Sequence, residues 1–175
     1  MTQEIKIEKK ASDVIQPKTA ADARQAIRAK QDLSGANLRG MQLAELNTVG
    51  AILRKTDLTD ADLSHGLLVN PNFYKASLHQ TAINNSAILG GDLVKTSFKG
   101  ADLSDSALIG VDAQNASFEN AKLQNAALIS ANLQETDFTN ANLTDAMLAY
   151  SNVKDADFTG ANLTGARHHG VDWSQ

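Results

Sequence analysis

The 175-residue chain has no cysteine, two prolines, one tryptophan and two tyrosines, and aromatic residues make up only 5% of it. The absence of cysteine excludes disulfide bonds, cysteine-ligated metal or iron–sulfur sites, and thiol nucleophiles. A net charge of -4 argues against a strongly basic nucleic-acid-binding protein. No apolar run follows the charged N-terminal residues, so we expect no signal peptide, no membrane span and a cytoplasmic location.

Alanine, leucine and asparagine are abundant, with 27, 20 and 14 residues respectively, and so much asparagine is unfavourable in a helical bundle. A repeat of five residues explains this composition. In steps of five from Leu33 to Trp173, 25 of the 29 central positions are Leu, Phe, Ile or Val. Two residues before each centre, 23 of the 29 positions are Ala, Gly, Ser or Thr.

A period of five fits neither a helix, nor a strand, nor a heptad coiled coil. It indicates a solenoid in which each pentad forms one short side and a corner, with the central and the small residue pointing inward. Asn and Asp often precede the centre, where they suit tight turns. Phenylalanine recurs every 20 residues, which predicts four pentads per coil and a stack of rings in the core. The stack comprises Phe98, Phe118, Phe138 and Phe158.

The A-(D/N)-(L/F)-x-x pattern of residues 31–175 resembles the pentapeptide repeat family. This resemblance implies an all-β fold, a right-handed quadrilateral parallel β-helix of about seven four-pentad coils. The small position departs from the family pattern at Gln31, Met41, Leu46 and Pro71. We therefore expect an irregular first coil, and at Pro71 a corner that lacks one backbone donor.

The residues before the repeat divide into two segments. Residues 1–16 are expected to form an arm that is either disordered or laid as a strand along the rod. Residues 17–30 predict a short α-helix that caps the first coil, with Thr19 as N-cap and Asp22 three residues later. At the other end, Trp173 either seals the last coil or lies where two ends meet as a dimer.

No catalytic or metal-binding pattern is present in the sequence. In an extended segment His168 and His169 would point in opposite directions, and residues 56–62 (TDLTDAD) lack the spacing of a calcium loop. There is no phosphate loop, dinucleotide fingerprint or nucleophile elbow. We expect a protein that is not an enzyme, with no cofactor, no small-molecule substrate, and neither direct nucleic-acid nor membrane binding.

One side of the predicted coil carries apolar residues at outward positions. They form a candidate protein-binding face, comprising Val49, Leu67, Val69, Leu89, Ile109, Ile129, Met147 and Tyr150. Two alternatives remain open at this point. These side chains are shielded by their neighbours, or the N-terminal arm, with Ile5, Ile7, Val14 and Ile15, folds back over part of the face.

Three functions are compatible with the sequence. The first is a scaffold that binds a protein partner, or a second copy, through the apolar face. The resemblance implies a second, because some pentapeptide repeat proteins mimic DNA and bind gyrase through an acidic rod; residues 31–175 carry a net charge of -7, but lysines interrupt the acidic surface. The third is a structural or self-associating module with no assigned role, as in many cyanobacterial members of the family.

Overall fold

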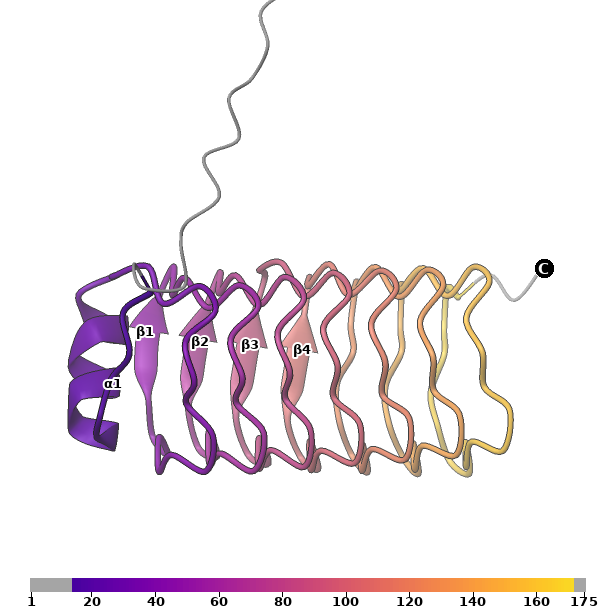
Figure 1. Cartoon of the computed structure of the whole chain (residues 1–175). Helices are drawn as coiled ribbons and strands as arrows, with labels where there is room; N and C mark the ends of the chain where they lie inside the picture. The colour runs from indigo at the N-terminus through magenta and orange to yellow at the C-terminus, as the bar shows by residue number, and fades with distance from the viewer. Residues whose placement is uncertain (1–13, 172–175) are drawn as a thin grey trace, which may run out of the picture.

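The structure is a computed structural model that describes residues 14–171. The helix lies across one end of an elongated rod, and the strands succeed one another along one side of it (Figure 1). The elements of the described chain are α1 (Ala20–Arg28), β1 (Asn47–Val49), β2 (Leu67–Val69), β3 (Ala87–Leu89) and β4 (Ala107–Ile109).

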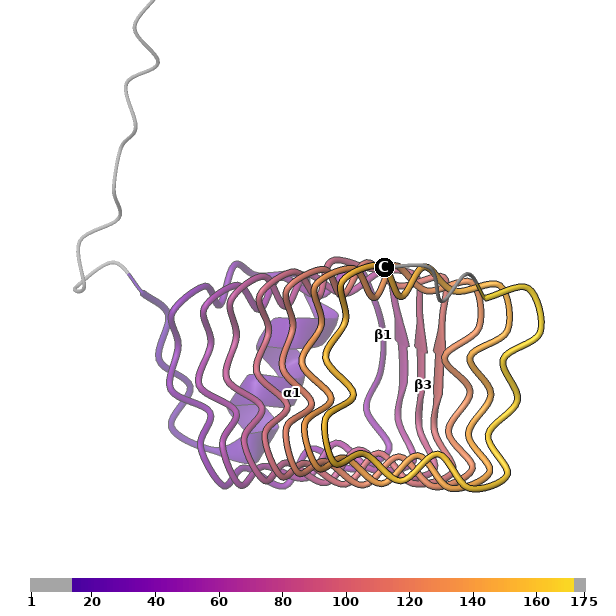
Figure 2. The same cartoon turned by 90° about the vertical axis from the view of Figure 1, so that its right-hand side faces the viewer.

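Backbone pairing between residues 20 apart builds the rod. The strands form one parallel sheet in the order β1-β2-β3-β4, in which Asn47 pairs with Leu67. Four pentads therefore make one coil, as the phenylalanine spacing predicts, and the coils are four-sided in end view (Figure 2). Three further columns of parallel bridges begin at the pairs Asp32–Ile52, Asn37–Asp57 and Gln42–Asp62.

The core consists of the central residues of the pentads and the small residues beside them. Every central residue from Leu33 to Val153 is buried, and so is every small-position residue from Ala36 to Ala156 except Met41 and Gly91, which are partly buried. The inward orientation of both positions is confirmed. A narrow coil has room for one large side chain per side, and this explains the small residue next to it.

The phenylalanine rings at residues 98, 118, 138 and 158 lie in successive coils. Their centroids are 4.7, 5.1 and 4.9 Å apart, and neighbouring planes are inclined by 2°, 7° and 6°. These spacings match the distance of about 4.8 Å between paired strands, because equivalent side chains follow the backbone stacking. Phe98, Phe118 and Phe138 are fully buried, and Phe158 is partly buried in the last described coil.

Threonine in the small position adds hydrogen bonds between coils. The Thr81 hydroxyl donates to the Leu58 carbonyl, 23 residues earlier, at 2.8 Å, and Thr96 donates to Phe73 at 2.7 Å. Among the described residues, no buried side-chain nitrogen or oxygen lacks a partner. Threonine can therefore replace alanine without the penalty of an unsatisfied buried hydroxyl.

Each pentad ends at a corner with a left-handed backbone conformation. All 28 corner residues from Gly35 to Gly170 have positive φ, and 19 of them are Gly, Asn or Asp. Of the 14 asparagines, seven precede a centre and six occupy corners, so the asparagine excess has two structural causes. The sequence interpretation identified only the first cause, although Asn is one of the few side chains that readily adopt positive φ.

Helix α1 begins with the predicted cap. The Thr19 hydroxyl accepts from the Asp22 backbone N–H at 3.1 Å, and the Asp22 carboxylate accepts from the Thr19 N–H at 3.1 Å. The buried side of the helix is formed by Ala23, Ala26 and Ile27, which join the core. The helix thus lies against the first coil and covers apolar side chains that would otherwise be exposed at this end.

The expectation of an irregular first coil is wrong. The first coil pairs in register with the second on all four sides. Leu46 is fully buried, and Gln31, shortly after the end of α1, is exposed. The coil after Pro71 makes room for it with a glycine, Gly91, 20 residues later. A Cβ on Gly91 would lie only 2.5 Å from the Pro71 carbonyl oxygen, so this position requires glycine.

Residues 14–19, the described part of the segment before α1, do not lie over the candidate protein-binding face. Val14 approaches Gly35, at 3.8 Å from the place of a glycine Cβ, and Ile15 lies beside α1 near Asp22 and Gln25. The expected arm of residues 1–16, including Ile5 and Ile7, falls mostly outside the described residues, as does Trp173.

Replacement of Phe118 by alanine is expected to lower the free energy of unfolding by about 3–5 kcal/mol, because the ring is fully buried between two stacked neighbours. Urea unfolding followed by circular dichroism measures this change. Lys154→Ala, at an exposed surface position, is the control and should change the free energy by less than about 0.5 kcal/mol. An effect of Phe118→Ala below about 1 kcal/mol would contradict the described packing.

The corner at Lys95, with φ 59°, tests the left-handed geometry. Lys95→Gly is expected to raise the free energy of unfolding by up to about 1 kcal/mol, since glycine adopts positive φ without strain. Lys95→Val is expected to lower it by about 1 kcal/mol, because a branched Cβ fits this region poorly. Thermal and urea unfolding of both variants provide the measurement. Equal effects of the two substitutions would show that the corner conformation does not limit stability.

Candidate protein-binding surface

The side of the rod that carries β1–β4 has no charged residues over six coils. Its pentads, residues 46–50, 66–70, 86–90, 106–110, 126–130 and 146–150, contain no Asp, Glu, Lys or Arg. Parallel pairing continues beyond β4 through the bridges Ala107–Ala127 and Ala127–Met147, so these pentads lie in one column. We call the eight predicted residues on this side the apolar face.

Half of the apolar face is well exposed. Val49, Leu67, Ile109 and Tyr150 are 54%, 41%, 39% and 63% exposed, respectively. Among the described residues, the other exposed large hydrophobic residue is Ile15, which lies beside α1. Exposed apolar surface is therefore concentrated on one side of the rod.

The other half of the apolar face is partly buried. These residues are shielded by equivalent side chains of the coils before and after them. Leu89, for example, pairs with Val69 on one side and Ile109 on the other. Shielding by neighbours, one of the two alternatives raised by the sequence, thus contributes along the column. The partly buried members are Val69, Leu89, Ile129 and Met147.

The residue before each centre contributes to the difference between the polar sides of the rod and the side that carries β1–β4. On the other sides an Asp or Asn there accepts from the backbone N–H two residues later, as Asp57 does from Thr59 at 3.0 Å. Leu67, Ala87 and Ala107 cannot accept such a bond, and these segments are extended strands. An apolar residue in place of Asp or Asn thus both removes this local hydrogen bond and presents an apolar side chain at the surface. Asn47 in β1 is an exception, because its side-chain oxygen accepts from the Leu67 N–H of the next coil at 3.0 Å.

Tyr150 lies at the far end of the apolar face in a backbone conformation that is unusual for its size. Its φ is 61°, and its ring contacts His169 edge-on at 5.6 Å between centroids. A Cβ at Gly170 would lie 2.8 Å from the Tyr150 ring, so glycine in the next coil makes room for it. An aromatic residue at positive φ costs about 1–2 kcal/mol, which the surrounding coils offset.

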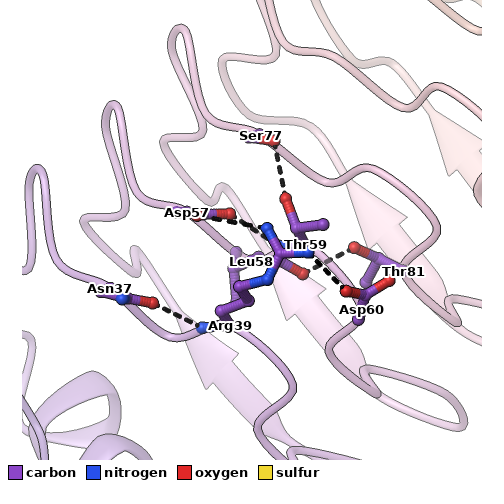
Figure 3. Close-up of polar contacts among 8 residues, drawn as sticks. All are labelled: Asn37, Arg39, Asp57, Leu58, Thr59, Asp60, Ser77 and Thr81. Carbon is purple, nitrogen blue, oxygen red and sulfur yellow. Dashed lines mark hydrogen bonds and ion pairs between the residues drawn. The ribbon is translucent and has the colours of Figure 1, made fainter.

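The side of the rod opposite β1–β4 holds a cluster of opposite charges. The Arg39 guanidinium lies 2.8 Å from the Asp60 carboxylate and 4.0 Å from Asp57, while the Thr59 hydroxyl shares a 3.0 Å hydrogen bond with Ser77 (Figure 3). Further along the rod, Lys99 pairs with Glu119 and Lys122 with Asp102. These exposed pairs connect neighbouring coils and reduce the acidity of the rod surface.

Hydrogen bonding shifts the ionisation of the turn carboxylates. Bonds from the Thr59 hydroxyl and N–H, with the charge of Arg39, lower the pKa of Asp57 below its ordinary value of 3.8 despite partial burial. Burial raises the pKa of Asp102, but bonds from Ser104 and Lys122 outweigh it, and the net shift is downward. The ionised carboxylate is the form that the turn stabilises.

In residues 14–171, no group of three or more His, Asp or Glu side chains is placed to hold a metal ion. Of the histidine pair considered from sequence, His169 packs against Tyr150 and His168 occupies an exposed central position in the last described coil. Over the described segment, no helix is both long and apolar enough to cross a bilayer.

Two basic residues at the near end of the apolar face were not recognised from sequence. Arg28, in the last turn of α1, and Lys30 border a groove together with Val49, Leu67 and Val69. Lys30 precedes Gly50 by 20 residues. Extending the 20-residue coil period by one coil toward the N-terminus would have placed Lys30 at this end of the apolar face.

The stacked four-sided coils define a β-solenoid repeat protein. Two family models match the chain, one described as a pentapeptide repeat region over residues 89–158, the other as pentapeptide repeats (8 copies) over residues 32–68. Together these matches span more than half of the sequence. The chain belongs to the pentapeptide repeat family.

Several solved structures are similar to this chain. HetL, a pentapeptide repeat protein involved in heterocyst differentiation regulation from the cyanobacterium Nostoc sp. strain PCC 7120, is 24% identical over 79% of this chain and 81% of its own, with a TM-score of 0.35. Trypsin-treated QnrB1, a plasmid-mediated fluoroquinolone resistance protein, is 19% identical over 81% and 69%, with a TM-score of 0.49. A protein from the Arabidopsis thaliana thylakoid lumen is 26% identical over 82% and 68%, with a TM-score of 0.22. No curated protein sequence matches the chain.

Acid is expected to destabilise the fold through the turn carboxylates. A carboxyl whose folded pKa is lowered adds stability above its unfolded pKa and loses that contribution as the pH falls through the folded pKa. For Asp57 and Asp102, the loss is therefore expected below the ordinary value of 3.8. Urea unfolding at pH values above and below this value measures the dependence.

The variant Asp57→Asn/Asp102→Asn is expected to show a weaker loss of stability in acid than the unchanged protein. Asp155→Asn, at an exposed corner, is the control for the removal of a carboxyl group. An unchanged acid dependence in the double variant would exclude these two turns as its source.

Proposed function

We propose that this pentapeptide repeat protein is a non-enzymatic scaffold that binds a partner protein through its apolar face. The observation that carries the proposal is the concentration of exposed Val49, Leu67, Ile109 and Tyr150 on one uncharged side of the rod. In the proposed form, the scaffold is a right-handed quadrilateral β-helix of about seven coils, and its location is cytoplasmic.

The expected size of the apolar face supports this function. An apolar strip over five or six coils covers several hundred Å², near or beyond what monomeric proteins usually leave exposed. Burial of about 500 Å² would contribute about 12 kcal/mol before the costs of association. The side chains are attached to hydrogen-bonded coils, so little backbone order would be lost on binding.

The other sides of the rod support a structural role for their polar residues. Asp57 is bonded to Thr59 and paired with Arg39, and the Ser104 hydroxyl donates to Asp102 at 2.7 Å. Carboxylates held in turns and ion pairs have defined roles in the fold, which favours a binding module over an enzyme.

DNA mimicry, the function that the family resemblance also implies, has less support. A DNA mimic needs rows of unpaired negative charge, whereas Asp60, Glu119 and Asp102 are each paired with a cation. The apolar face, in contrast, has no structural explanation apart from the shielding described above.

The double variant Ile109→Lys/Ile129→Lys is expected to fold and to lose the partner. Both side chains project from the apolar face, and a lysine can extend its charged end into water. The matched control is Gln114→Lys/Gln134→Lys, the same charge change in the equivalent pentad position on the next side. Affinity capture from the producing cells, with circular dichroism as the test of folding, compares the three proteins.

Proteins retained by the unchanged chain and by the glutamine control, but not by the isoleucine variant, would support the proposal. Unfolding of the isoleucine variant would show that these residues belong to the core. Equal capture by all three proteins would reject the apolar face as the binding site. Sedimentation of the purified proteins detects self-association, and a gyrase supercoiling assay tests the mimicry alternative.

A further inference from the structure

The apolar face ends in a groove where α1 meets the first coils. The groove has a volume of about 520 Å³. Its aliphatic side is formed by Val49, Leu67 and Val69, and its basic side by Arg28 and Lys30. Apolar and basic side chains therefore border the same open space at one end of the rod.

The two basic side chains are available for a ligand. Arg28 and Lys30 are both exposed, and within residues 14–171 neither lies within 4.0 Å of a carboxylate oxygen or forms a side-chain hydrogen bond. A cation near a helix C-terminus interacts favourably with the helix dipole, which explains Arg28 in part. Lys30 lies beyond the helix at a corner with φ 55°, where glycine or asparagine would be less strained.

Charge complementarity distinguishes between the possible occupants of the groove. The six uncharged pentads are bounded by Arg28 and Lys30 at one end, and by Arg167, which pairs with Met147, at the other. A second copy placed face to face would bring cations against cations in the parallel and in the antiparallel orientation. A partner with carboxylates beside its apolar side chains would instead be attracted and oriented.

We propose that the groove binds an acidic, aliphatic segment of the partner protein. In this arrangement a carboxylate of the segment lies between Arg28 and Lys30, and its aliphatic side chains lie on Val49, Leu67 and Val69. This inference rests on the proposed function and deepens it, because it specifies the chemistry of the partner and the end of the rod at which it is held.

A display library of random short peptides, selected on the full-length protein, is the probe. Enriched peptides are expected to combine Leu, Ile or Val with Asp or Glu. A synthetic copy of the most enriched peptide is then titrated by fluorescence polarisation. Enrichment of peptides without carboxylates, or no enrichment at all, would overturn the inference.

Charge reversal provides the decisive comparison. The variant Arg28→Glu/Lys30→Glu is expected to weaken peptide binding by about tenfold or more. The matched control Lys55→Glu/Lys95→Glu carries the same change in charge at two exposed corners on another edge, and should weaken binding by less than about twofold. Circular dichroism shows whether both variants fold. Equal weakening of peptide binding in the two variants would show that the effect comes from net charge alone and would overturn the inference.

The same peptides separate this inference from the proposed function. Binding that is lost in Ile109→Lys/Ile129→Lys but unchanged in Arg28→Glu/Lys30→Glu would leave the apolar face as a binding site and reject the role of the basic end. Peptide binding that is unchanged in both variants would reject the basic end, and cell capture unaffected by the isoleucine substitutions would reject the proposed function.

Discussion

The structure depends on one interaction, the backbone hydrogen bond between successive coils in a register that does not shift. Phe98 donates to the Ser117 carbonyl and Phe118 to the Asp137 carbonyl, both at 2.7 Å, and equivalent bonds recur along the rod. Because the register is constant, residues 20 apart lie above one another. The ring stack, the threonine bonds between coils and the uniform character of each side all follow from this superposition. A preference at one pentad position thereby becomes a continuous stripe on the surface.

The second constraint is the corner, which must turn through a left-handed conformation at every fifth residue. Gly, Asn and Asp meet this requirement with little strain, and they occupy most corners. The remaining corners carry larger residues such as Lys30 and Tyr150, each at an end of the apolar face. Their local strain is offset by the inter-coil bonds on either side, so the rod can display these side chains where a short peptide turn would disfavour them.

The residue before each centre links the fold to the proposed function. An Asp or Asn before the centre closes a local hydrogen-bonded turn and leaves a polar surface, as at Asp57. A Leu or Ala there cannot close such a turn and, on the side that carries β1–β4, leaves an apolar surface, as at Leu67 and Ala107. On the side that carries β1–β4, apolar residues occupy this position in consecutive coils from Leu67 to Met147. Contacts among aliphatic side chains replace the polar hydrogen bonds there. Such a surface is held in place by hydrogen-bonded coils before any partner binds, which suits the proposed protein-binding function.

The sequence by itself determined the repeat, the inward positions, the coil of four pentads and the membership of the apolar face, because a strict period converts spacing directly into position. The N-cap of α1 was also predictable, since Thr19 and Asp22 interact locally. Only the tertiary structure decided how far each apolar side chain is exposed, since this depends on its neighbours 20 residues away. It also corrected the expectation of an irregular first coil, which pairs in register with the second on all four sides, and it showed that Gly91 accommodates Pro71 one coil earlier. The groove with Arg28 and Lys30 depends on how the helix packs across the end of the rod, a long-range contact that no local pattern specifies.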